Sequence, residues 1–103
     1  MSETGIMRDI LVRITELPGA MFYRQNAGVG VTRAGTILHA GVAGCPDITG
    51  CYRGRAVGIE VKSPTGRQSE PQRRFQAAWE RAGGLYVLAR SVAEALAALE
   101  AIP

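Results

Sequence analysis

The chain has 103 residues, of which 47% are hydrophobic and 20% are charged, which fits one small folded domain over residues 1–103 and excludes an intrinsically disordered chain. The formal net charge of +3 indicates a mildly basic surface, which suits a polyanionic partner such as nucleic acid. No apolar stretch approaches the length of a membrane span, so we expect no membrane association.

The first half of the chain predicts a helix, a strand and a glycine-rich segment. Apolar residues recur at helical spacing over residues 3–17, and Pro18-Gly19 ends that helix. Residues 21–26 include two aromatic side chains and predict a strand. Residues 27–46 contain five glycines and predict one short strand near residues 36–39 between loops.

The second half predicts a β-hairpin and a strand that follows a helix. The arms of the hairpin are residues 47–52 and 56–62, which turn at Arg53-Gly54-Arg55. Ser69 and Gln72 have the spacing of a capping box at the start of a helix over residues 70–82. A buried strand over residues 85–89 and a last helix after Ser91 complete the chain.

The resulting order of elements is αβ(β)ββαβα, which predicts an α/β fold. The hairpin arms pair antiparallel, whereas the strand, helix and strand over residues 57–88 predict a right-handed crossover between parallel strands. The sequence therefore predicts a mixed β-sheet flanked by helices.

Three polar residues of the hairpin have the arrangement of a metal-dependent phosphodiesterase site. Side chains alternate along a strand, so Glu60 and Lys62 share one face, and Asp47 begins the partner arm at the open end of the hairpin. Two carboxylates on a rigid sheet can hold Mg²⁺ or Mn²⁺, and a nearby lysine can orient or deprotonate the attacking water. Lys62 is the only lysine beside 11 arginines, as expected if the site needs a compact ammonium group.

Glu60 and Lys62 also have a purely structural explanation. Exposed strands often alternate acidic and basic residues that pair across the sheet, so Glu60 and Lys62 alone are a weak signal. The Pro46-Asp47 pair thirteen residues before Glu60, on the same hairpin, strengthens the catalytic interpretation.

Five short segments in a fixed order carry a resemblance to a known family. They are Arg24-Gln25-Asn26-Ala27-Gly28, Gly44-Cys45-Pro46-Asp47-Ile48, Ile59-Glu60-Val61-Lys62-Ser63, Ser69-Glu70-Pro71-Gln72 with Phe75, and Gly83-Gly84 with Tyr86-Val87. This string resembles the VRR-NUC family of the PD-(D/E)xK nuclease superfamily, and it extends from about Met7 to Leu96. The resemblance implies a restriction-endonuclease-like fold in a small stand-alone phage or bacterial domain.

The resemblance also implies a function and a site. The function is a Mg²⁺- or Mn²⁺-dependent endonuclease that cuts DNA, selects branched or Holliday-junction-like structures and works as a homodimer. Asp47, Glu60 and the backbone carbonyl of Val61 become the metal ligands, and Lys62 activates the water. Gln72 matches a helix glutamine that contacts substrate or supports the site, although it could equally serve only as the capping partner of Ser69.

Basic and polar residues around this site are candidates for binding nucleic acid. Arg24 and Asn26 match a family segment, where Arg24 could hold a phosphate or pair with an acid inside the fold. The full candidate set is Arg24, Asn26, Arg53, Arg55 and Arg67.

One departure from the family concerns the first helix, where a glutamate usually faces the site. Met7 occupies the matching position in this chain. Glu3 lies one helical turn earlier and could substitute as a metal ligand, whereas Asp9 lies at the wrong angle. Without a substitute the site has one carboxylate fewer and a second metal would bind weakly.

The remaining chemically notable residues favour structural roles. Cys45 and Cys51, in a chain whose N-terminal residues lack the apolar run of a signal peptide, indicate reduced thiols and a cytoplasmic location. With His39 they supply too few ligands for structural zinc. Trp79 and Tyr86 are expected in the core rather than as base-stacking residues.

The sequence is therefore consistent with three hypotheses about the function of the chain. The first is an active, structure-selective DNA endonuclease. The second is a non-catalytic nucleic-acid-binding module that retains the nuclease fold, which Met7 favours. The third is an oligomerising accessory protein in which Glu60 and Lys62 merely form an ion pair.

Overall fold

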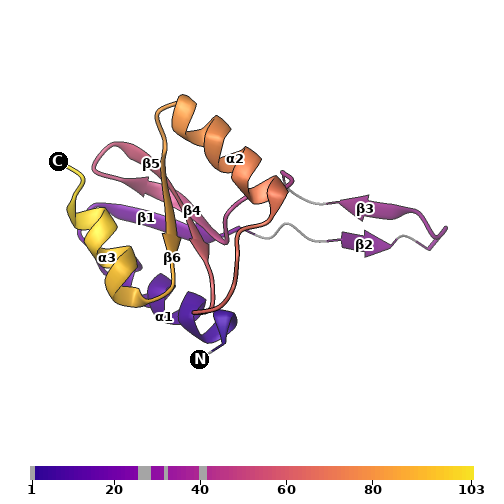
Figure 1. The fold of residues 1–103 in the computed structure, drawn as a ribbon, viewed down its shortest axis with the longest axis horizontal. Coiled ribbons are helices and arrows are strands. Elements are labelled where there is room, and N and C mark those ends of the chain that lie inside the picture. Colours follow the sequence, from indigo (N-terminus) through magenta and orange to yellow (C-terminus); the bar gives the residue numbers. More distant parts are fainter. Residues whose placement is uncertain (1, 26–28, 32, 40–41) are drawn as a thin grey trace.

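The computed structural model describes residues 2–25, 29–31, 33–39 and 42–103. Within these residues the elements follow the order α1 (Glu3–Thr15), β1 (Ala20–Arg24), β2 (Val29–Val31), β3 (Ile37–His39), β4 (Ile48–Tyr52), β5 (Arg55–Val61), α2 (Glu70–Arg81), β6 (Leu85–Ala89) and α3 (Val92–Glu100) (Figure 1). The predicted α/β fold with a mixed sheet is confirmed. Where the sequence predicted one short strand in the glycine-rich segment, the structure has two, β2 and β3.

A four-stranded sheet in the order β1-β4-β5-β6 forms the centre of the molecule. Strands β1 and β5 both pair antiparallel with β4, and β6 pairs parallel with β5, as the predicted hairpin and crossover require. Strands β2 and β3 form a separate antiparallel hairpin, which extends away from the sheet as an arm (Figure 1).

The hydrophobic core lies between one face of this sheet and helices α1 and α3. Ile10 and Ile14 of α1 and Leu99 of α3 are fully buried there, together with Ile59 of β5. Because side chains alternate along β5, Glu60 points to the opposite face, where α2 lies. The core face therefore fixes the strand that presents the acidic residue. None of the helices in the described part of the chain has the length and hydropathy that a membrane span needs.

Helix α2 covers the second face of the sheet without burying any of its own residues. Its inner side is held by the Phe75 ring, whose centroid lies 5.4 Å from that of Trp79 and 6.5 Å from that of Tyr86. The Trp79 indole donates a 2.9 Å hydrogen bond to the carbonyl of Leu85. Gly84 permits this approach, since a Cβ at that position would overlap the indole ring. A few aromatic contacts thus position the whole helix.

The start of α2 has the predicted capping box. The Ser69 hydroxyl accepts from the Gln72 amide at 3.3 Å, and the Gln72 side chain accepts from the Ser69 amide at 2.8 Å. Two of the orphan amides at the helix N-terminus are satisfied in this way. Gln72 is consequently held at the end of α2 that faces β5.

Truncating the core beneath Glu60 should cost stability. We expect Ile59→Ala to lower the free energy of unfolding by about 2–5 kcal/mol, because it removes a fully buried side chain from a closely packed core. Val12→Ala, at a position 58% exposed on α1, should change it by less than about 0.5 kcal/mol. Urea denaturation of the two variants measures both values, and equal losses would contradict the placement of the core.

Candidate active site

The register of the β4–β5 hairpin brings Asp47 next to Glu60. Ile48 pairs with Ile59, so the residue before Ile48 lies beside the residue after Ile59. Both carboxylates line one open cavity of about 430 Å³. The other lining residues are Arg24, Gln25, Gly44, Cys45, Ser69, Pro71 and Gln72. The structure therefore gathers two predicted metal ligands, the helix glutamine and one predicted phosphate-binding arginine around a single hollow.

Asp47 is anchored from both neighbouring strands. Its Oδ2 accepts a 2.9 Å hydrogen bond from the Val61 amide, and its backbone carbonyl accepts one of 2.8 Å from Gln25. The amide and carbonyl of a strand residue point to the same edge of the strand, so the Val61 carbonyl also faces Asp47. The Val61 carbonyl, which is the predicted third metal ligand, therefore lies on the same side of β5 as the Asp47 carboxylate.

Glu60 is an acid held where its charge is disfavoured. Glu60 is only 3% exposed. Its buried Oε2 has no hydrogen-bond partner in the described part of the chain. Burial, and then the neighbouring Asp47 carboxylate, raise the pKa of Glu60 from 4.5 to about 8, although Lys62 acts in the opposite direction. An unpartnered carboxylate oxygen beside a second carboxylate is a donor set that suits a hard divalent cation.

Side chains alone do not complete a metal site. Among the described residues, no three histidine, cysteine or acidic side chains converge closely enough to hold an ion. The arrangement thus fits a cation held by Asp47 and Glu60 with backbone or solvent oxygens filling the other positions, as Mg²⁺ prefers.

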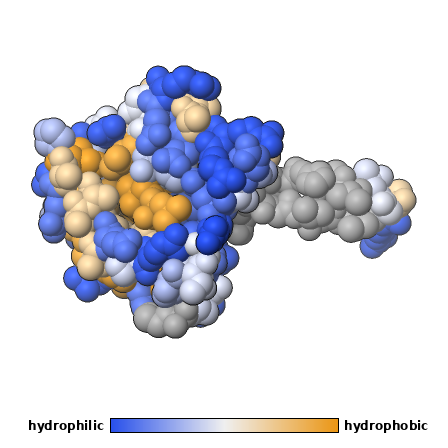
Figure 2. All heavy atoms as spheres, in the orientation of Figure 1, coloured by the Kyte–Doolittle hydropathy of each residue, from blue (hydrophilic) through white to orange (hydrophobic). Residues whose placement is uncertain are grey.

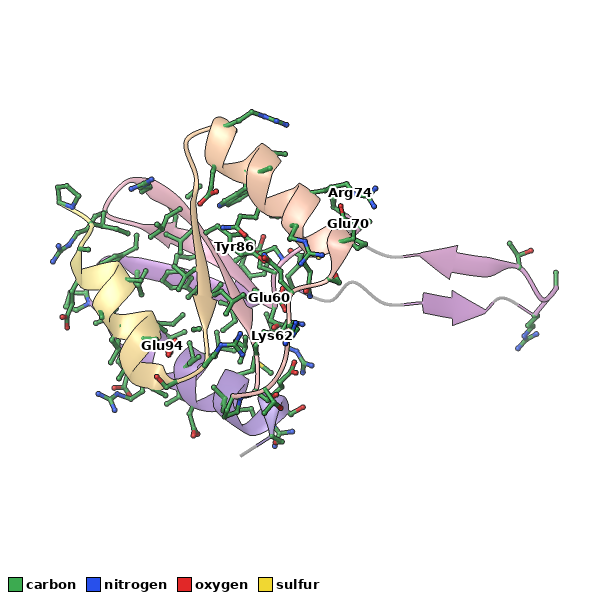
Figure 3. The ribbon with its side chains drawn as sticks, viewed as in Figure 1. Glu60, Lys62, Glu70, Arg74, Tyr86 and Glu94 are labelled. Atoms are coloured by element: carbon green, nitrogen blue, oxygen red, sulfur yellow. The ribbon has the colours of Figure 1, made fainter. Side chains whose placement is uncertain are left out.

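Glu3 and Lys62 approach the site from its other end. A Cβ on Gly66 would lie 3.3 Å from the Glu3 Oε2 and 3.4 Å from the Lys62 Cδ, so both side chains flank this glycine. Glu3 also lines a smaller hollow of about 90 Å³ with Asp47. Figure 3 shows Glu60 and Lys62 near one another along β5. Glu3 thereby supplies an acidic group near the site.

The other two candidates on the first helix do not serve this purpose. Met7 is 5% exposed and belongs to the core, although it also borders the smaller hollow beside Asp47. Asp9 lines a different depression with Val12 and Arg13. The carboxylate nearest the site on α1 is therefore one turn earlier than the position that the family resemblance indicates.

Gln72 lies where both of its predicted roles would require it. It lines the cavity beside Glu60, while its side chain also closes the capping box with Ser69. The capping bond fixes the orientation of the side chain that borders the cavity. A structural role and a site role are compatible at this position.

The arginine candidates separate into two groups. Arg24 borders both hollows, and Arg67 is exposed on the connection between β5 and α2. Arg53 and Arg55 lie at the closed end of the hairpin, about 16 Å from Glu60 by strand rise. There Arg53 donates to the Ile102 carbonyl at 2.8 Å, and Arg55 donates to the Gly83 carbonyl at 3.4 Å. The candidate Asn26 lies outside the described residues.

Arg90 is a residue of the site region that sequence reasoning missed. Its Nη1 donates hydrogen bonds of 2.6 Å and 2.7 Å to the carbonyls of Ser63 and Gly66. Arg90 thereby holds the turn that directly follows Lys62. Nothing in the sequence pattern marks a long-range bond from an arginine to backbone carbonyls.

The aromatic and thiol residues are placed as follows. Tyr86 is 7% exposed, as expected of a core residue, and its hydroxyl accepts from Gln68. Trp79, expected in the core, is instead only half-buried and borders a surface groove as well as the aromatic cluster, because α2 lies on the outer face of the sheet. Cys45 borders the cavity, where burial raises the pKa of its thiol, and Cys51 is exposed. His39 lies in β3.

A solved structure described as a VRR_NUC domain has the same fold as this chain. The two superpose with a TM-score of 0.71 at 17% sequence identity, and the match covers all of both chains. No family model and no curated protein matches the sequence. The resemblance drawn from the short segments is thus confirmed for the fold.

The raised pKa of Glu60 predicts how metal-free stability depends on pH. The folded chain keeps a proton on Glu60 up to about pH 8, whereas the unfolded chain loses it near pH 4.5. The free energy of unfolding should therefore fall as the pH rises between these values. Urea denaturation in EDTA measures this slope.

The matched variants isolate the responsible group. Glu60→Gln cannot ionise, so it should flatten the slope and be more stable than wild type at pH 8. Glu16→Gln, at an exposed position, should keep the wild-type slope. A slope that survives Glu60→Gln would assign it to other groups.

Proposed function

We propose that the chain is a metal-dependent endonuclease that hydrolyses phosphodiester bonds in DNA. The observation that carries this proposal is the unpartnered, buried oxygen of Glu60 beside Asp47 in an open cavity. Its nuclease-like fold and mildly basic charge support the same conclusion. Burying a carboxyl oxygen of Glu60 without a partner, next to a second acid, costs stability, so a function at this position is the simplest reason for it.

The residues around the cavity would divide the reaction between them. Asp47, Glu60 and the Val61 carbonyl would hold Mg²⁺ or Mn²⁺, which when bound polarises the phosphodiester and neutralises the charge that develops on it. Lys62 would orient the attacking water or accept its proton. Arg24 and Gln72, on two walls of the same cavity, would bind and orient the substrate strand.

The two other hypotheses differ from this one in what they require. An accessory protein in which Glu60 and Lys62 merely pair is disfavoured, because the ion pairs found among the described residues join Glu70 to Arg73 and Arg74. A non-catalytic nucleic-acid-binding module would need the basic residues but no strained acidic pair. The orphaned Glu60 oxygen favours the enzyme over the binding module.

Removing the charge of Glu60 tests the enzyme directly. We expect Glu60→Gln to lower Mn²⁺-dependent cleavage of labelled DNA at least about 10²-fold, because it removes a metal ligand while it keeps the shape of the side chain. Circular dichroism should be unchanged. Glu16→Gln is the matched control and should cut at the wild-type rate, whereas undiminished cutting by Glu60→Gln would move the active site elsewhere.

Glu3 should act as the substitute for the usual first-helix glutamate. We expect Glu3→Gln to raise the Mn²⁺ concentration needed for half-maximal cleavage about tenfold, since one nearby carboxylate is lost. Asp9→Asn on the same helix faces another depression and should leave the metal dependence unchanged. Equal effects of the two substitutions would indicate a general loss of negative charge rather than a role at the site.

Selection of branched DNA by a homodimer is the finer part of the proposal. A domain of this size buries little surface alone, and a two-fold pair would present two sites to one DNA molecule. Figure 2 shows hydrophobic atoms at the surface over β6, an edge strand whose residues are buried or half-buried. Met21 and Tyr23 are exposed on the other edge strand, β1, and apolar surface of this kind suits such a partner. Sedimentation velocity should show a dimer, and cleavage should favour junctions over linear duplex. A strict monomer would remove the dimer and leave the chemistry intact.

A further inference from the structure

A groove with apolar walls runs along α2 beside the proposed active site. It has a volume of about 380 Å³, within the range of small-ligand sites. Its lining residues are Val42, Ala43, Arg74, Phe75, Ala78, Trp79 and Ala82. None of these residues takes part in the reaction described above, so the groove needs its own explanation.

Two aromatic rings and two small side chains of α2 line the groove. Phe75 and Trp79 are stacked with an interplanar angle of 25°, and the indole is fixed by its bond to Leu85. Ala78 and Ala82 add no bulk that would fill the space beside these rings. A rigid aromatic surface with free space beside it suits a planar, apolar group.

The same two segments line the groove and the catalytic cavity. Gly44 and Cys45 border the cavity, whereas Val42 and Ala43, directly before them, border the groove. On α2, Gln72 belongs to the cavity and Phe75 to the groove, about 4.5 Å further along the helix axis. A strand held in the cavity could therefore enter the groove within a nucleotide or two.

Arg74 gives the groove an attraction for phosphate at the end nearer the cavity. Its side chain is 73% exposed and lies 3.8 Å from Glu70, a separation at which an exposed pair contributes little. Figure 3 shows Arg74 and Glu70 on the part of α2 next to the arm. The guanidinium is thus able to contact the backbone of a strand whose base lies between α2 and residues 42–43.

We propose that this groove binds an unpaired nucleobase adjacent to the phosphodiester in the catalytic cavity. The proposal deepens the proposed function, because it rests on DNA as the substrate and adds a preference for single-stranded segments. A base inside a duplex is stacked and paired, so an unpaired base enters the groove at lower cost. A second copy of the chain is the alternative occupant; it would have to cover about 800 Å² of this surface, and self-association is therefore one of the outcomes tested below.

The chain carries its own probe for this test. Trp79 is the only tryptophan, so its fluorescence reports directly on the groove. Binding is measured in EDTA, where no cleavage occurs, with short oligothymidylate and with an abasic strand that keeps every phosphate. The base-containing strand should quench Trp79 and bind about tenfold more tightly than the abasic strand.

Two substitutions on neighbouring residues separate the groove from the rest of the helix. Ala78→Leu fills the groove and should weaken oligothymidylate binding about tenfold and remove the quenching, while abasic binding is unchanged. Ala77→Leu lies on α2 outside the groove and should behave as wild type; the identical replacement also matches helix propensity. Circular dichroism confirms that both variants fold.

Three results would overturn the proposal. The first is equal binding and quenching by the two strands, and the second is an unchanged affinity in Ala78→Leu. The third is a loss of self-association in Ala78→Leu, which would make the groove an interface between copies. Because these measurements need no cleavage, a failed nuclease assay with normal base-dependent binding would reject the enzyme and keep the groove. Normal cleavage without base-dependent quenching would reject the groove as a base-binding site and keep the proposed nuclease activity.

Discussion

The arrangement of the site depends on the antiparallel pairing of Ile48 with Ile59. This pair sets Asp47 beside Glu60 and directs Glu60 away from the core. A slip by one residue would exchange the two faces of β5 and place the acid among the isoleucines. The register is fixed by the full burial of both isoleucines and by a two-residue turn, in which Arg53 and Gly54 have φ of 52° and 76°.

The same register creates an electrostatic conflict that the fold tolerates. Two carboxylates meet at the wall of the open cavity, and of the two only Asp47 receives a hydrogen bond from the backbone in the described structure. The raised pKa of Glu60 relieves this repulsion, because the side chain keeps its proton. A divalent cation can take the place of that proton. The rest of the sheet and the core formed with α1 and α3 supply the stability that offsets this local cost.

Much of the fold and the central pair of acids could be predicted, because each rests on local pattern. The capping box of Ser69 and Gln72 and the two arms of the hairpin are read from residues close in sequence. Strand β2 was missed, since three residues around a glycine give no alternation to recognise. Helical spacing named Glu3 as a candidate, but whether it reaches the site depends on the angle at which α1 crosses the sheet. Arg90 acts through backbone carbonyls 24 and 27 residues away and was missed. Such long-range geometry has no signature in a single sequence.

Helix α2 forms one wall of the cavity, yet it has no buried residue of its own. Its attachment to the sheet consists mainly of the aromatic cluster, the indole bond to Leu85, and Gln68, whose side-chain amide donates to both Gln76 and Tyr86. Segments with so few buried contacts open at a free energy below that of global unfolding. The width of the cavity therefore depends on how closely α2 is held to the sheet. A displacement of this helix would change the space beside the acidic pair without moving the pair itself, which the β4–β5 hairpin holds.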